Sequence, residues 1–356
     1  MGLLNKLFGP RTHTVTAQPS GRQFVVNSGQ SILKAALAQG IAFPHSCTVG
    51  TCGSCKCKLR SGKIREIANF AYVLNADELR AGIILACQAA AKTDVTLEVP
   101  NLSAKRLQPA TDFVGTLTAL RDLTHDIKRY TLTLDRPLRF DAGQYVQLST
   151  PEVWGARAYS LAVPPLPEGN LEISFFIRQV PGGAFTDWLF TGASLGKAFK
   201  VHGPAGNFWL RESRAPFICI AGGSGLAPLM AILQHAVARQ IGRPCVVLFG
   251  ARTAADLYGL DEIAEIKKQW NGAFVFIPVL SNEAPGNAWT GERGLVTERI
   301  AAHVQDLAGG DSEAYLCGPP PMIDAALPRL AELGFQPANI HCDKFLDGSH
   351  GLQRQD

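Results

Sequence analysis

Four cysteines near the start of the chain constrain its fold more than any other feature. Three follow the pattern C-x4-C-x2-C and the fourth comes after 31 intervening residues: Cys47, Cys52, Cys55 and Cys87. Four thiolates at this spacing can hold a [2Fe–2S] cluster. Gly50 and Gly53 permit the positive φ that a loop wrapped around two irons needs. We therefore predict that these four cysteines are metal ligands.

Other uses of these cysteines fit the sequence less well. Disulfides persist in oxidising compartments, and the chain shows no secretory signal, which favours reduced thiols and a cytoplasmic location. A zinc site usually has two C-x2-C knuckles or adds histidines, and a Rieske centre needs two histidines where only His45 lies near. Cys57 is expected to be a small apolar filler rather than a further ligand.

Length and composition limit the remaining possibilities. A chain of 356 residues predicts two to three domains, and its 46% hydrophobic and 18% charged residues are typical of a soluble globular protein. No apolar run reaches membrane-spanning length, and a net charge of +4 gives no reason to expect nucleic acid. The first 100 residues hold eleven basic and five acidic side chains. This excess predicts either a solvated face beside an anionic cluster or a docking face for an acidic partner.

The pattern of elements changes twice along the chain. Short strands and a helix around the cysteines predict a β-grasp domain, and evenly spaced strands then predict a small antiparallel β-barrel. From Pro216 strands alternate with helices, which predicts a doubly wound parallel sheet. The predicted parts are a terminal segment (1–11), the cluster domain (12–100), a linker (101–110), the barrel (111–212), the parallel-sheet domain (213–345) and a tail (346–356).

Two parts of this division carry more detailed expectations. The barrel strands are expected at Val114–Leu120, Ile127–Leu134, Gln144–Ser149, Ala158–Val163 and Leu171–Arg178, with a helix at Ala184–Phe190. The apolar and basic segment 1–11 is expected to be a frayed terminus, with weak peripheral contact to a membrane surface as the alternative.

Two motifs in the barrel suit a flavin dinucleotide. Arg157 can bind a pyrophosphate, Tyr159 offers an aromatic face to the ring, and Ser160 offers a hydroxyl near its reactive edge. A glycine turn that opens the following helix can supply a helix N-terminus to the phosphates, through Gly182, Gly183 and Thr186. Together these residues predict an FAD site.

Two glycine-rich turns follow strands of the parallel-sheet domain. Their residues are Gly222, Gly223, Ser224 and Gly225 in the first, and Cys317, Gly318 and Pro319 in the second. Ligands of open α/β sheets bind at the carboxyl ends of strands, where both turns fall. The first turn departs from the G-x-G-x-x-G fingerprint, so it does not define a standard Rossmann site alone. Cys317 could also be a buried structural thiol.

These motifs carry a family resemblance. Residues 12–100 resemble plant-type ferredoxins, and the two later domains resemble the ferredoxin–NADP⁺ reductase superfamily. The resemblance implies that Phe176, Ile177 and Arg178 bind the flavin and that Cys317 lies beside the nicotinamide. It implies an aromatic near the flavin at Phe345. It also implies that cofactor choice is made near Arg252, where the thin basic cluster favours NADH over NADPH. Ser160 and Cys317 are the predicted catalytic positions.

Residues 12–345 as a whole resemble the reductase components of bacterial multicomponent oxygenases, including those of aromatic-ring catabolism. That resemblance implies electron flow from NADH to FAD, to the [2Fe–2S] cluster, and on to an oxygenase or an intermediary ferredoxin. Two alternatives remain: a three-module reductase of deoxysugar biosynthesis, and a redox-sensing binding module with a structural cluster.

Overall fold

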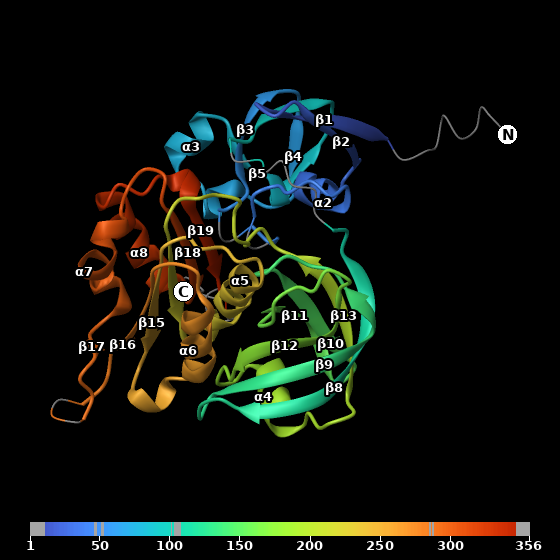
Figure 1. Ribbon diagram of the computed structural model, residues 1–356. Helices are drawn as coiled ribbons and strands as arrows, with labels where there is room; N and C mark the ends of the chain where they lie inside the picture. The colour runs from blue at the N-terminus through green and yellow to red at the C-terminus, as the bar shows by residue number, and fades with distance from the viewer. Residues whose placement is uncertain are drawn as a thin grey trace, which may run out of the picture. The chain divides into compact units, whose positions relative to one another are not determined.

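A computed structural model describes residues 11–45, 48–50, 53–100, 102, 108–284, 286 and 288–346 (Figure 1). Contacts divide the chain into two compact units, Met1–Ala110 and Thr111–Asp356. Among the helices of the described ranges, none combines the length and apolar character that crossing a membrane requires.

The first unit is built on a five-stranded sheet in the order β2-β1-β7-β3-β5. Strand β1 pairs antiparallel with β2 and parallel with β7, the arrangement of a β-grasp fold. A short ribbon of β4 and β6, which the sequence pattern did not reveal, lies beside it. The elements are β1 (Thr12–Gln18), β2 (Arg22–Asn27), α2 (Ile32–Ala38), β3 (Lys56–Ser61), β4 (Ile64–Glu66), α3 (Ala76–Arg80), β5 (Ile83–Leu85), β6 (Ala89–Ala91) and β7 (Val95–Glu98).

Local chemistry explains where these elements form. Val15 and Ala17 on β1 are buried at alternate positions, which is the period of a strand with one face on the core. Ser31 caps the N-terminus of α2, because its hydroxyl accepts the Lys34 amide at 3.2 Å, and the helix ends before Gly40, which has φ 73°. The predicted helix and strands of this region are therefore present.

The barrel of the second unit is an antiparallel sheet of six strands in the order β11-β10-β13-β8-β9-β12. Two predictions need correction. Strand β11 begins at Val153 and ends at Ser160, earlier than predicted, and the sixth strand β13 was not predicted because Gly203 and Pro204 lie within it. The elements are β8 (Thr111–Asp122), β9 (Ile127–Leu138), β10 (Tyr145–Thr150), β11 (Val153–Ser160), β12 (Asn170–Arg178), α4 (Ala184–Thr191) and β13 (Ala198–Ala205).

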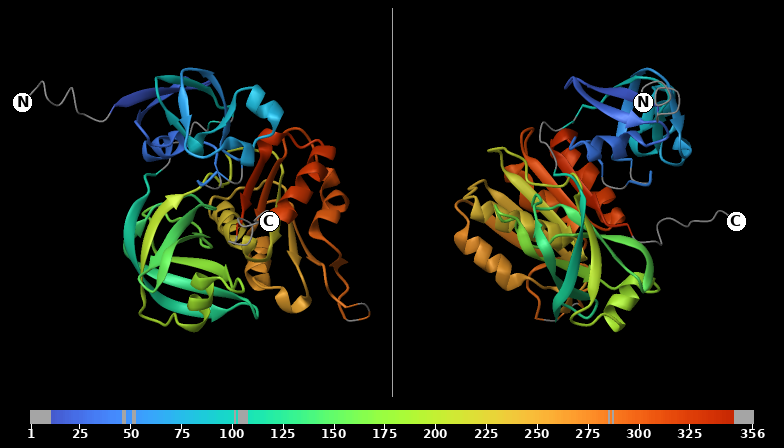
Figure 2. Two further views of the ribbon diagram at one scale, coloured as in Figure 1. Left: turned by 180° about the vertical axis from the view of Figure 1, so that it is seen from behind. Right: turned by 90° about the vertical axis from the view of Figure 1, so that its right-hand side faces the viewer.

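The rest of the second unit is a parallel sheet in the order β17-β16-β15-β14-β18-β19. Successive residues of β14 alternate between two apolar clusters, one containing α5 and α6 and the other α7 and α8, so helices cover both faces (Figures 1 and 2). The elements are β14 (Phe217–Gly222), α5 (Leu226–Ala238), β15 (Cys245–Ala251), α6 (Leu260–Gln269), β16 (Phe274–Leu280), β17 (Glu292–Arg293), α7 (Ile300–Val304), β18 (Glu313–Gly318), α8 (Pro320–Glu332) and β19 (Ile340–Lys344).

The strand order of the parallel sheet reverses between β14 and β18, and the two glycine turns follow these strands. Such a switch point is where doubly wound sheets bind ligands. The cluster that contains α5 also includes Ala162 and Phe176 of the barrel, so barrel and sheet share one core at this edge.

Candidate functional site

Two of the four predicted metal ligands lie within the described residues. The Sγ atoms of Cys55 and Cys87 are both buried and lie 3.2 Å apart, well beyond the ~2.05 Å of a disulfide. Pairing of β3 with β5 brings them together, since Cys55 precedes β3 and Cys87 lies in the 3-10 turn after β5. Cys47 and Cys52 lie outside the described residues. Two adjacent buried thiols that are not joined by a disulfide fit one half of a four-thiolate cluster site.

The turn around these thiols has the shape that the sequence predicted. Gly50 and Gly53 have φ of 85° and 72°, and a Cβ at Gly50 would lie 2.6 Å from Cγ of Gln88. Cys57 points into the apolar core of the first unit, and burial, followed by the charge of Cys55, raises the pKa of its thiol far above the usual value. Cys57 is therefore a poor thiolate and an apolar filler.

The predicted flavin residues of β11 lie at an open edge of the barrel. Arg157 is exposed and donates only to the Ala156 carbonyl, at 3.1 Å, among the hydrogen bonds of the described chain. The Tyr159 ring packs against Phe185, with ring centroids 5.9 Å apart, and burial raises the pKa of its hydroxyl. A guanidinium without a carboxylate partner beside a fixed aromatic ring suits a dinucleotide phosphate and a stacked ring.

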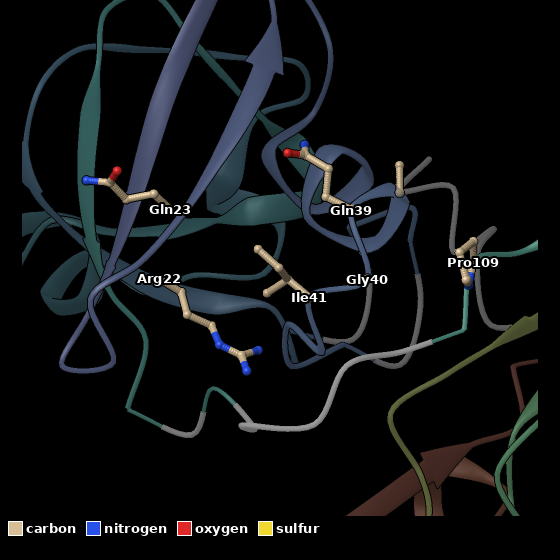
Figure 3. A pocket seen from close by; sticks show the side chains of 7 residues that line it. Arg22, Gln23, Gln39, Gly40, Ile41 and Pro109 are labelled. Atoms are coloured by element: carbon tan, nitrogen blue, oxygen red, sulfur yellow. The ribbon is translucent and has the colours of Figure 1, made fainter.

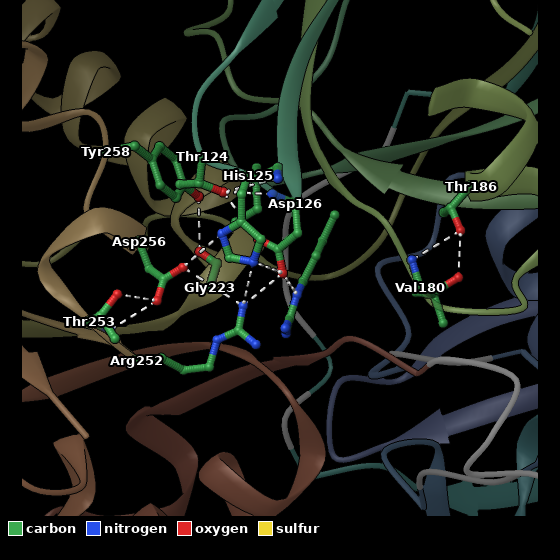
Figure 4. A network of polar contacts seen from close by, with 12 residues as sticks. Thr124, His125, Asp126, Val180, Thr186, Gly223, Arg252, Thr253, Asp256 and Tyr258 are labelled. Carbon is green, nitrogen blue, oxygen red and sulfur yellow. Dashed lines mark hydrogen bonds and ion pairs between the residues drawn. The ribbon is translucent and has the colours of Figure 1, made fainter. Parts of the chain in front are cut away.

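The glycine turn before α4 is shaped by its own contacts. The Thr186 hydroxyl accepts the Val180 amide at 3.1 Å and lies within hydrogen-bond distance of two carbonyls, that of Val180 at 3.2 Å and that of Gly183 at 3.1 Å (Figure 4). A Cβ at Gly183 would lie 2.8 Å from this hydroxyl, whereas Gly182, at φ 74°, has nothing within 4 Å. Thr186 therefore holds the loop in place. The groups that this turn can offer to a phosphate are the α4 N-terminus and the Gly182 backbone.

Strand β12 places its three predicted flavin residues differently. Phe176 packs edge-on against Tyr258, with centroids 5.4 Å apart, Ile177 is buried in the barrel core, and Arg178 is ion-paired with Asp126 at 2.8 Å. Their side chains are thus occupied by the protein itself. However, β12 is an edge strand, and apart from the Ser174 carbonyl, which accepts the Ala162 amide at 2.8 Å, its outer backbone groups are available to a ligand. Backbone hydrogen bonding to a flavin ring fits this edge better than side-chain contact.

Ser160, Cys317 and Asp343 converge where the barrel meets the parallel sheet. The Ser160 hydroxyl donates to Oδ2 of Asp343 at 3.2 Å, and Asp343 is the register partner of Cys317 on the neighbouring strand. Burial raises the pKa of Asp343 to about 6, and the Ser160 hydrogen bond opposes this rise. Burial also raises the pKa of Cys317 well above its usual value, so this thiol is neutral and not a nucleophile.

Asp343 was not among the predicted site residues. A signal was present, because Asp343 lies two residues before Phe345, the aromatic that the family resemblance placed near the flavin, and at the carboxyl end of a strand. The Phe345 amide donates to the Gly318 carbonyl at 2.9 Å, and its half-buried ring packs against the core that barrel and sheet share.

The two glycine turns pack directly on each other. A Cβ at Gly225 would lie 2.1 Å from the Cys317 carbonyl oxygen, and a Cβ at Gly222 would lie 2.6 Å from Sδ of Met322. Gly318 has φ 148° and its Cβ would lie 3.1 Å from the Gly222 backbone. These glycines therefore serve close packing of backbone on backbone. Gly223 and Ser224 stay half-buried and Pro319 exposed at the rim.

Arg252 lies in a charged cluster at the carboxyl end of β15 (Figure 4). Its Nη2 is 2.9 Å from Oδ2 of Asp126, 3.7 Å from Oδ1 of Asp256 and 3.4 Å from Nε2 of His125. His125, Asp126 and Asp256 lie close enough together to suggest metal ligation. The guanidinium of Arg252 already supplies the cation among them, so the cluster is an ion-pair network.

A pocket of about 490 Å³ lies in the first unit, and neither Cys55 nor Cys87 lines it (Figure 3). Gln39 lines it, but its amide is bonded to the backbone of Val25 in both directions, at 2.6 and 3.1 Å. We assign this pocket no part in the chemistry.

Comparisons with known proteins agree with this geometry. The chain matches the 2Fe-2S iron-sulfur cluster binding domain family over residues 15–92, the oxidoreductase FAD-binding domain family over 115–209 and the oxidoreductase NAD-binding domain family over 219–327. Three such domains in one chain define an iron–sulfur flavoprotein oxidoreductase that binds a [2Fe–2S] cluster, FAD and NAD(H).

Relatives extend almost the full length of the chain. It is 42% identical to the xylene/toluene monooxygenase electron transfer component of Pseudomonas putida, over 94% of each protein, and 36% identical to the phenol 2-monooxygenase reductase component of a Pseudomonas species, over 96% of each. The crystal structure of the Amycolatopsis cytochrome P450 reductase GcoB superposes with a TM-score of 0.78, at 36% identity, covering 94% of this chain and 98% of that one. The chain belongs to the family of electron-transfer reductase components of multicomponent oxygenases. These relatives give no support to the deoxysugar alternative.

Proposed function

We propose that this chain takes a hydride from NADH and delivers electrons singly to the oxygenase component, or an intermediary ferredoxin, of an aromatic-hydrocarbon oxygenase system. When bound, FAD supplies the conversion from an electron pair to single electrons, and the [2Fe–2S] cluster supplies the one-electron outlet. The observation that carries the proposal is the contact of Ser160 with Asp343 beside Cys317, in the chain that also holds the Cys55–Cys87 thiol pair.

The residues have distinct roles in this proposal. Arg157 and the α4 N-terminus hold the FAD phosphates, Tyr159 packs on the ring, and the β12 edge hydrogen-bonds it. The turns at Gly222–Gly225 and Cys317–Pro319 bind the nicotinamide nucleotide, and the Cys317 thiol beside it is uncharged. Orientation of donor and acceptor is the main contribution, since hydride transfer needs no side-chain base.

Passing the electrons of a hydride to one-electron acceptors also requires that a proton be released. A hydride carries one proton and two electrons, so sending both electrons to one-electron acceptors releases that proton. The Asp343 carboxylate, bonded to the Ser160 hydroxyl at 3.2 Å, is placed to receive it through Ser160 Oγ. Its raised pKa, about 6, keeps it a better proton acceptor than an exposed aspartate.

Anaerobic titration of the purified holoprotein tests the proposed function. NADH should bleach both the flavin and the cluster absorbance. NADPH should do so with at least about tenfold lower kcat/KM, because Arg252, the arginine expected near the 2′-position, is ion-paired with Asp126 at 2.9 Å. Absence of bleaching by either nucleotide would defeat the proposal.

Asp343 should impose a pH dependence on activity. Because the carboxylate is the form that accepts a proton, reduction of a one-electron acceptor should fall about tenfold per pH unit below pH 6 and level off above it. Asp343→Asn should have a low rate that does not change with pH in this way. The matched control is Asp324→Asn, an exposed carboxylate paired with Lys344 at 2.5 Å, which should keep the wild-type profile.

The same carboxyl group should affect stability with a defined sign. A pKa raised from 3.8 to about 6 means that the folded state holds a proton that the unfolded state has lost. Its stabilising contribution is complete below pH 4 and is lost as pH rises through 6. Asp343→Asn should therefore melt higher than wild type at pH 8 and equally at pH 4. A lower melting temperature at pH 8 would contradict this assignment.

We further propose that this protein is cytoplasmic and that its first unit docks an acidic partner. The basic residues next to the cluster support this weakly, because Lys56 and Arg60 are ion-paired with Glu78 and Glu98. Better support comes from a second pocket of about 490 Å³ in the first unit, whose basic side chains have no ion pair among the described residues: Arg11, His13, Arg65 and Lys92. Electron transfer to the partner should then slow as salt rises. The proposed membrane contact of residues 1–11 lies almost wholly outside the described residues.

A further inference from the structure

Asp126 lies in the turn between β8 and β9 of the barrel, yet its carboxylate reaches the parallel sheet. Oδ2 accepts from Arg252 Nη2 at 2.9 Å and from Arg178 Nε at 2.8 Å, and Oδ1 accepts from the Thr124 hydroxyl at 3.1 Å (Figure 4). The side chain is 16% exposed. Both oxygens are therefore fixed, and the carboxylate is an immobile negative charge beside Arg252.

A second carboxylate completes the enclosure of Arg252. Oδ2 of Asp256 accepts the amide and the hydroxyl of Thr253, each at 2.9 Å, so this side chain is fixed as well. Its Oδ1 lies 3.7 Å from Arg252 Nη2. The charges of Arg178 and Arg252 are balanced by those of Asp126 and Asp256, and the cluster is neutral when His125 is neutral.

The position of Arg252 makes this balance important for nucleotide choice. In doubly wound sheets an acidic residue after the second strand binds the ribose 2′-hydroxyl, whereas an arginine nearby accommodates a 2′-phosphate. Arg252 follows β15, the neighbour of the strand with the first glycine turn, and remains 49% exposed. By its place alone it would favour NADPH. A phosphate approaching it would, however, meet two fixed carboxylates and their like-charge repulsion.

We propose that Asp126, a barrel residue, is a specificity determinant for the dinucleotide: it binds Arg252 and so prevents this arginine from serving a 2′-phosphate. The inference rests on the proposed use of NADH and adds the residue responsible. Burial acts to raise the pKa of Asp126, but the hydrogen bond and charge of Arg178 outweigh it and hold this pKa below its usual value, so the carboxylate stays ionised.

The test is calorimetric binding of two probes, adenosine 2′,5′-bisphosphate and 5′-AMP, to the oxidised holoprotein. Asp126→Asn should shift the ratio of the two affinities about tenfold toward the bisphosphate. Asp122→Asn is the matched control, because it removes the same charge from the same hairpin but pairs with Lys128 at 3.3 Å. It should leave the ratio unchanged. In Asp126→Asn/Arg252→Gln the shift should disappear.

Several results would overturn the inference. An unchanged ratio in Asp126→Asn, with a wild type that prefers NADH, would remove Asp126 as a determinant and leave the proposed function intact. A wild type without preference would remove both the NADH preference and its explanation. Arg252→Gln alone gives an answer even if Asp126→Asn fails to fold. It should weaken bisphosphate binding less than threefold, and a loss of tenfold or more would mean that Arg252 is already free to bind phosphate.

Discussion

Replacing Cys87 with serine should separate the two halves of the electron path. With one thiolate lost, the cluster absorbance should be absent and NADH-driven reduction of a protein acceptor should fall by more than about 100-fold, because changing even a residue that only supports a metal ligand costs 10- to 100-fold in affinity. NADH:ferricyanide activity should persist within a few-fold, since a small oxidant can take electrons directly from the flavin. Visible spectra and the two steady-state assays measure this.

Cys57→Ala is the control for this change. Cys57 is buried in the same core, two residues from Cys55, so its loss perturbs packing without removing a predicted ligand. The variant should be less stable but should keep the cluster spectrum and the transfer rate. If Cys87→Ser retained both, the assignment of Cys87 as a ligand would be wrong, and the proximity of its sulfur to Cys55 would have another explanation.

The sequence predicted the fold best where each strand is buried on both faces. Strands β14, β15 and β18 are nearly continuous apolar runs separated by helices, which is the alternation that the sequence showed from Pro216 onward. Strand β13 was missed because its Gly203 and Pro204 are residues that usually end a strand. Its pairing with β8 and β10 is tertiary and leaves no local signal.

Prediction of the candidate site was limited in the same way, by contacts that leave no local signal in the sequence. Motifs that are local in sequence, such as Arg157 to Ser160, could be assigned from residue chemistry alone. Contacts between residues that are distant in the sequence could not be predicted in this way. Ser160 and Asp343 are 183 residues apart, and Asp126 and Arg252 are 126 apart, so only the fold reveals that they meet. The side chain of Arg178, a residue that the family resemblance implied binds the flavin, is bonded to Asp126, a contact that its own strand does not reveal.

Loss of Glu313 alone should strongly destabilise the second unit. It forms a buried ion pair with Arg243, with N–O distance 2.7 Å and side chains 5% and 8% exposed, and it also accepts the Tyr315 hydroxyl at 2.8 Å. Arg243 in turn donates to the Ala215 carbonyl at 2.5 Å and the Arg211 carbonyl at 3.2 Å, in the segment that joins β13 to β14. The pair therefore holds the connection between barrel and parallel sheet.

Glu313→Leu should lower the free energy of unfolding by about 3 to 5 kcal/mol, because it leaves the Arg243 charge buried without a counter-charge. The double variant Arg243→Met/Glu313→Leu should regain most of this loss, since an apolar pair of similar volume removes the uncompensated charge. Glu332→Gln, which breaks the exposed pair with Arg329 at 3.3 Å, should cost no more than about 1 kcal/mol. Urea unfolding of the three variants measures these differences. If the double variant were as unstable as Glu313→Leu, the loss would come from the backbone bonds of Arg243 and not from an unpaired charge.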